Sequence, residues 1–106
     1  MPKYLFKVSY TSEGARGIAK EGGTSRRDTI DKLAQNSGGK LESFYFAFGD
    51  DDAYVTIDLP DNSTAAAVAL TVNSSGAVQV RTVVLMTPEE VDEATRTSVD
   101  YRPPGA

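Results

Sequence analysis

The stretch KLESFYFAFGDDDAYVTIDL, from Lys40 to Leu59, decides the fold. Its first part, through Gly49, is unusually aromatic, and its last part, from Ala53, is rich in β-branched and aromatic residues. Both compositions are typical of β-strands, and the GDDD between them is typical of a tight turn. The stretch therefore predicts a β-hairpin.

Helical segments flank this hairpin on both sides. The residues from Ser12 to about Ser37 predict one bent helical region, interrupted at Gly22 and Gly23. After the hairpin, Pro60 ends the strand, and the residues DNST open a helix that NSSG closes. Small residues dominate the apolar side of this second helix, which lets it lie close to a sheet.

The first and last strands of the chain complete the pattern, one over Lys3–Tyr10 and one over Ala77–Met86. The order of elements is then β-α-β-β-α-β, which is the ferredoxin-like arrangement of the α+β class. Right-handed crossovers place both helical segments on one face of the sheet.

A further helix is predicted after the last strand. In TPEEVDEATR, Thr87 and Glu90 have the spacing of a capping box, and Pro88 stands at the first helical position. The final YRPPGA cannot extend a helix, so we expect residues 97–106 to form a flexible or docked tail. Residues 1–96 are predicted to form one domain, since single domains of about 100 residues are common.

The composition excludes many reaction classes. The 106 residues include no cysteine and no histidine, which excludes disulfides, thiol nucleophiles, Cys/His metal sites and imidazole catalysis. The net charge of −4 disfavours nonspecific DNA binding. The GDDD turn lacks the spacing of a calcium loop, and turn preference explains its aspartates more simply. We therefore predict no cofactor, no metal and no nucleic-acid partner.

No long apolar run occurs in the chain. A membrane span needs roughly 18 apolar residues, and the N-terminus lacks the apolar region of a secretory peptide. We therefore predict no membrane partner, and the cytoplasm is the default location.

Both faces of the predicted sheet carry apolar residues. In the first and last strands, Leu5, Val83 and Leu85 point away from the other apolar residues of their strands. A second apolar face in so small a domain predicts a homodimer, or a higher assembly, with sheets packed face to face. The alternative is a monomer with aromatic side chains exposed on both faces, which is rare. The first hairpin strand is also split, with Phe44, Phe46 and Phe48 on one face and Leu41 and Tyr45 on the other.

Four stretches together resemble the GYD-domain family of small bacterial proteins: PKYLFKVSYTSEGARGIAKEGGTSRRD, GGKLESFYFAFGD, DLPDNSTAAAVAL and TVVLMTPEE. The resemblance covers about Pro2 to Glu93 and implies a dimeric α+β barrel, in a family whose biochemical role is largely uncharacterised. The naming motif of that family is glycine, a variable residue, tyrosine and aspartate. Here Asp51 stands where the tyrosine is usual.

Basic and aromatic residues supply the candidate binding site. The glycine pair is either a joint between helical pieces, which is favoured, or an anion-binding loop followed by two arginines. Tyr10, Tyr45 and Phe46 are either core aromatics or the lining of a cavity between sheet and helices. Two basic residues on one helix face either rim an opening or are simply solvated. The candidate ligand-binding residues are Tyr10, Arg16, Lys20, Arg26, Arg27 and Tyr45.

The leading functional hypothesis is the binding of a small organic or anionic molecule in a dimeric α+β barrel. The first alternative is a cofactor-independent oxygenase or isomerase of that fold, in which a tyrosine, arginine or carboxylate replaces the missing histidine. The second is a structural or protein-interaction module, supported by the acidic stretch Glu89–Glu93 and the YRPPGA tail.

Overall fold

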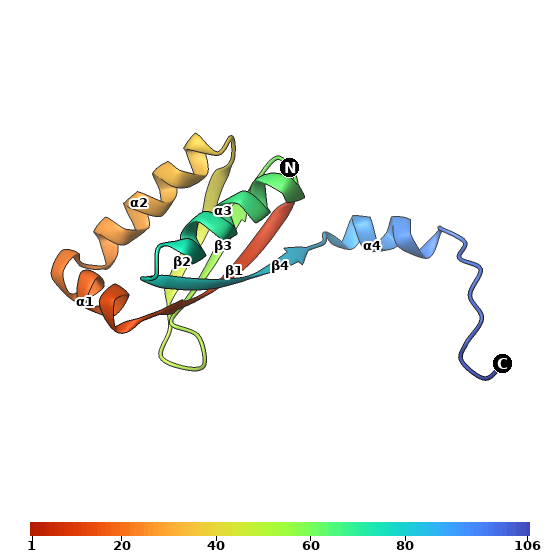
Figure 1. The fold of residues 1–106 in the computed structure, drawn as a ribbon. Coiled ribbons are helices and arrows are strands. Elements are labelled where there is room, and N and C mark those ends of the chain that lie inside the picture. The colour runs from red at the N-terminus through yellow and green to blue at the C-terminus, as the bar shows by residue number, and fades with distance from the viewer.

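The computed structural model describes all residues from Met1 to Ala106. Four strands and four helices follow one another along the chain (Figure 1). None of the helices combines the length and the apolar sequence that crossing a membrane requires. In chain order the elements are β1 (Lys3–Tyr10), α1 (Ser12–Glu21), α2 (Gly23–Asn36), β2 (Lys40–Phe46), β3 (Ala53–Asp58), α3 (Asn62–Ser74), β4 (Val78–Leu85) and α4 (Pro88–Thr95).

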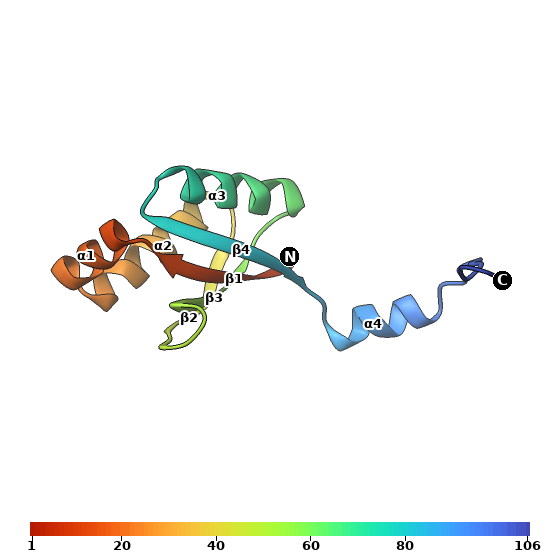
Figure 2. The ribbon, with the colours of Figure 1, turned by 60° about the horizontal axis from the view of Figure 1, so that its bottom comes forward.

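The strands form one antiparallel sheet in the order β2-β3-β1-β4. The helix α2 packs over β2 and α3 over β4, while α1 lies at the end of the sheet where β1 finishes (Figure 2). No helix lies on the other face, which we call the open face. The element order and strand order are those of the ferredoxin-like fold, so the predicted α+β fold is confirmed.

The hydrophobic core lies between the sheet and the helices α2 and α3. Alternate residues of β1 and β3 point into it, as the two-residue period of a strand requires. Ala34 and Ala65 are buried on the helix side, and their small side chains allow close packing. The buried Tyr4 hydroxyl donates a hydrogen bond to Asn62 Oδ1 at 2.6 Å, so this core phenol is satisfied. The buried apolar residues are Tyr4, Phe6, Val8, Ala34, Ala53, Val55, Ile57, Leu59, Ala65 and Val78.

The predicted bent helical region is two separate helices. Thr11 caps α1 through its side chain, which accepts from Gly14 N, and the helix ends at Gly22. The φ of Gly22 is +87°, a conformation that favours glycine, and α2 begins at the next residue. The glycine pair is thus a joint between helices.

A β-bulge in β2 changes which face Leu41 occupies. The pairing with β3 shifts between Leu41 and Ser43, so that Leu41 lies opposite Ile57 while Phe44 lies opposite Val55. Leu41 therefore packs against the core, and the prediction that it lies on the face away from Phe44 is wrong. The extra residue of the bulge inverts the alternation that the prediction assumed.

The strand β2 also ends sooner than predicted. It finishes at Phe46 rather than at Gly49, so Phe48 lies in the loop to β3 and not on the sheet. The Phe48 side chain is fully exposed.

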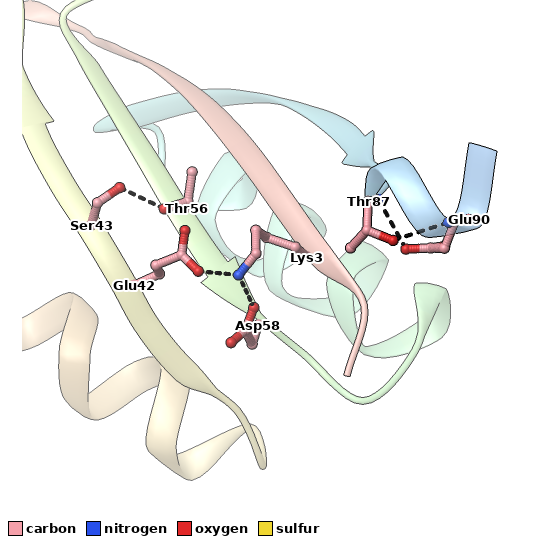
Figure 3. Close-up of polar contacts among 7 residues, drawn as sticks. All are labelled: Lys3, Glu42, Ser43, Thr56, Asp58, Thr87 and Glu90. Carbon is pink, nitrogen blue, oxygen red and sulfur yellow. Dashed lines mark hydrogen bonds and ion pairs between the residues drawn. The ribbon is translucent and has the colours of Figure 1, made fainter. Parts of the chain in front are cut away.

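The C-terminal arm, residues 86–106, extends away from the rest of the protein (Figure 1). Its helix α4 has the predicted capping box: Glu90 N donates to Thr87 Oγ1 and Thr87 N donates to Glu90 Oε1, both at 3.1 Å (Figure 3). Every residue of the arm is exposed. The radius of gyration is 16.9 Å, against about 13 Å for a compact domain of about 100 residues.

Candidate ligand-binding site

Three hollows meet at Tyr10, the last residue of β1. The loop between β2 and β3 fixes the backbone here, because Tyr10 N donates to Asp52 Oδ2 at 2.8 Å. In return, Asp52 N donates to Val8 O at 2.7 Å. Tyr10 is therefore held in place at the point where the sheet, α1 and this loop come together.

The largest hollow is an aromatic cleft of about 460 Å³, open to solvent. The Phe46 ring lies 6.4 Å from the Tyr10 ring and 5.0 Å from the Phe44 ring, between centroids. A side chain at Gly23 would begin 2.9 Å from Phe46 Cε2, so only glycine lets α2 approach this ring so closely. The cleft is lined by Tyr10, Ala15, Ile18, Gly23, Phe46, Ala47, Phe48 and Asp52.

A side groove of about 200 Å³ adjoins the aromatic cleft, since Tyr10 and Ile18 line both. Its charged residues are Glu13, Glu21 and Arg26. The third hollow, an inner void of about 30 Å³, lies between the sheet and the helices, with space for only about two water molecules. Its lining is apolar except for Arg26, which borders both the inner void and the side groove.

Arg26 has unmet hydrogen-bonding capacity. Its Nε is buried and has no hydrogen-bond partner in the protein. None of the five ion pairs of the chain includes Arg26. Leaving a buried donor unpaired costs about 1–3 kcal/mol, and such groups are rare in folded proteins.

The Tyr10 hydroxyl lies in the field of Arg26. Burial raises the pKa of Tyr10 above its ordinary value, while the Arg26 guanidinium beside it opposes the rise and the carboxylates of Asp52 and Glu21 add to it. The phenol is therefore protonated at neutral pH and serves as a hydrogen-bond donor, not as a base.

The helix α1 lines the aromatic cleft and the side groove without contributing to the core. None of its residues is buried. Its start is fixed to the loop before β4, where Thr11 N donates to Ala77 O at 3.1 Å and Thr11 Oγ1 donates to Gly76 O at 3.0 Å. Its end is the positive-φ Gly22. The helix is thus attached mainly at its two ends.

The structure brings together only two of the six predicted site residues, Tyr10 and Arg26. Consecutive residues of a helix point in directions about 100° apart, so Arg27 faces solvent, where it pairs with Asp28 at 3.3 Å. Tyr45 is 70 % exposed and lies opposite Tyr54, on the other side of the sheet from Tyr10. Arg16 and Lys20 are exposed and line none of the three hollows.

Of the eight residues that line the cleft, only Tyr10 was among the predicted site residues. The missed residues include Ile18, Phe48 and Asp52. Ile18 is the one large aliphatic residue of α1, so its apolar character in a polar helix was a usable signal. Phe48 gave a misleading signal, because it continues the alternation of β2 beyond the end of that strand.

The open face carries two clusters of charged residues. Lys3 Nζ pairs with Asp58 Oδ1 at 2.7 Å and also with Glu42 (Figure 3). Asp51 is 2 % exposed, and Arg81 Nη2 donates to its Oδ1 at 2.7 Å. Asp51 on this face and Asp52 beside Tyr10 thus have separate surroundings, and no three acidic side chains are grouped as metal ligands would be.

Comparison with known proteins gives one match. No curated protein and no solved structure matches significantly. The family model described as GYD domain matches residues 4–95, which include the sheet except for Lys3, the three hollows and α4. Since this match covers most of the chain, the protein belongs to the GYD domain family.

Proposed function

We propose that the protein binds a small organic molecule in the aromatic cleft. The observation that carries the proposal is the cleft itself, whose volume of about 460 Å³ falls within the roughly 300–1,000 Å³ of small-molecule sites. Its lining also fits, because apolar and aromatic side chains dominate and few polar groups are present.

The exposed Phe48 ring supports the same proposal. A phenylalanine ring in full contact with water is unfavourable, and covering it contributes about 1.5–3 kcal/mol. A flat molecule between Phe48 and the Ile18 side of the cleft would cover the ring and exclude water from Phe46. Contacts with two aromatic rings would thus contribute to the binding free energy of the ligand.

The proposal can be tested with 2-naphthylacetate, a flat aromatic probe, in a titration followed by ¹H–¹⁵N NMR. We expect saturable shifts at α1 and at the loop between β2 and β3. Replacing Phe48 by Ala should weaken binding at least about fivefold, since an aromatic contact contributes about 1 kcal/mol. The matched control is Tyr45→Ala, which removes an exposed aromatic ring from the open face and should leave the affinity unchanged. No saturable shifts, or equal losses in the two variants, would refute the proposal.

We also propose that two copies of the chain associate through their open faces. Leu5 lies opposite Val83 in the pairing of β1 with β4, and both belong to the face that no helix covers. Val83 is 40 % exposed, and Tyr54, on β3 at the other side of β1, is 38 % exposed. A second copy packed on this face would remove these side chains from water.

A further inference from the structure

Resting on the proposed binding function, we infer that the ligand is an apolar monocarboxylate whose carboxylate is bound by Arg26 while its apolar part occupies the aromatic cleft. The inference rests on Arg26, whose buried Nε has no hydrogen-bond partner and which is the one charged residue at the inner void as well as a residue of the side groove.

Arg26 is suited to a carboxylate by its chemistry as well as by its position. A guanidinium presents planar N–H groups that match the two oxygens of a carboxylate. Here the Nε–H is buried with no acceptor, and no carboxylate of the protein pairs with Arg26, so the guanidinium has no anionic partner within the chain. The side groove gives the head of a ligand access to this residue.

The Tyr10 hydroxyl offers a second donor to the same head group. It lies close enough to Arg26 for the guanidinium to influence its titration. Tyr10 also lines the aromatic cleft, so one end of a ligand can meet Arg26 while the other lies against Phe46. A ligand with an apolar body and a short acidic head group would therefore lie with its body in the cleft and its head group in the groove.

The two acids of the groove limit the charge that the ligand can carry. Glu13 and Glu21 line the groove together with Arg26, and both are exposed to solvent. One negative charge can be balanced by Arg26, but a phosphate with two negative charges would be repelled by the glutamates. A monocarboxylate is therefore the class that the groove favours.

The decisive experiment compares 2-naphthylacetate with 2-naphthylacetamide, which has nearly the same shape and no charge. Both are titrated into the full chain and followed by NMR at neutral pH. We expect the carboxylate to bind about 10- to 100-fold more tightly than the amide, because one charge-assisted hydrogen bond increases the affinity by about that factor. In Arg26→Ala the two affinities should become equal, while Arg27→Ala, which removes the same charge one residue away, should keep the preference.

Glu21→Gln gives a test with the opposite sign. Removing this negative charge should strengthen binding of the carboxylate and leave binding of the amide unchanged. Thermal unfolding of each variant verifies that it folds, and the comparison of the two probes on the unaltered chain needs no variant at all.

The outcomes separate the inference from the function on which it rests. If both probes bind the unaltered chain equally, the carboxylate inference is wrong and the binding function stands. If neither probe binds, the proposed function itself fails. If Arg26→Ala weakens both probes by the same factor, Arg26 only supports the structure of the site, which also contradicts the inference.

Discussion

Asp51 is a nearly buried carboxylate in the loop between β2 and β3. Arg81 donates to it at 2.7 Å, and Lys7 Nζ lies 3.8 Å from its other oxygen. The hydrogen bond from Arg81 is the main reason that the pKa of Asp51 is lowered, with contributions from Tyr54 and Lys7. The positive charges of Arg81 and Lys7 thus balance the negative charge of a carboxylate that is almost completely shielded from solvent.

The lowered pKa predicts a specific dependence of stability on pH. An aspartate with a folded pKa below its unfolded value of about 3.9 stabilises the fold above that value, and the contribution is lost as the pH falls through the folded pKa. Arg81→Ala should therefore lower the free energy of unfolding at pH 7, and the difference from the unaltered chain should shrink towards pH 3. Urea unfolding at both pH values measures it.

A control at another arginine distinguishes this pair from general charge effects. Arg27→Ala removes a positive charge whose partner, Asp28, is exposed, so it should change stability little at either pH. A loss in Arg81→Ala that is the same at pH 7 and pH 3 would show that packing, and not the charge of Asp51, is responsible.

Among the helices, α1 makes a very close backbone contact with the loop before β4. It contains two glycines, and their surroundings are opposite. A Cβ on Gly14 would lie 2.0 Å from Ala77 O, because the start of α1 approaches the loop before β4 very closely. A Cβ on Gly17 would meet nothing within 4 Å. The same substitution should therefore have opposite effects at two positions of one helix.

Gly17→Ala should stabilise the protein by about 0.5–1 kcal/mol, the advantage of alanine over glycine inside a helix. Gly14→Ala should destabilise it by about 1–3 kcal/mol, the usual cost of forcing extra volume into a tight contact. Urea unfolding of both variants checks the two signs. If Gly14→Ala were also stabilising, α1 would not be held against Ala77 O in solution.

The elements that were predicted well are those determined by local sequence. The capping box at Thr87 and Glu90 and the apolar face of β1 depend only on residue spacing, which the sequence displays. The bulge at Leu41 was missed because it is a property of how β2 pairs with β3, not of β2 alone. Likewise, spacing cannot tell which of Arg26 and Arg27 faces the core until the orientation of α2 is known.

For the molecule as a whole, the arm is the feature that a single copy explains least. The helix α4 has eight residues, and helices shorter than roughly 12–15 residues are marginal in water without tertiary packing. Its apolar residues, with those of the tail, have nothing to pack against within one chain: Val91 is 48 % exposed, Val99 77 % and Tyr101 70 %. In a homodimer, the arm of each copy could pack on the other, and two-fold symmetry would satisfy both arms at once.

The assembly state of the chain can be measured by light scattering after size-exclusion chromatography. We expect the unaltered chain to have twice its monomer mass at micromolar concentration. Val83→Lys places a charge in the proposed interface and should give a monomer, and deletion of residues 87–106 should raise the dissociation constant. The control is Leu70→Lys, which places the same charge on the outer side of α3, where the side chain is already 72 % exposed. That variant should remain a dimer, because α3 lies on the covered face of the sheet. A monomeric unaltered chain would refute face-to-face packing, and dissociation of both lysine variants would place the interface elsewhere than on the open face.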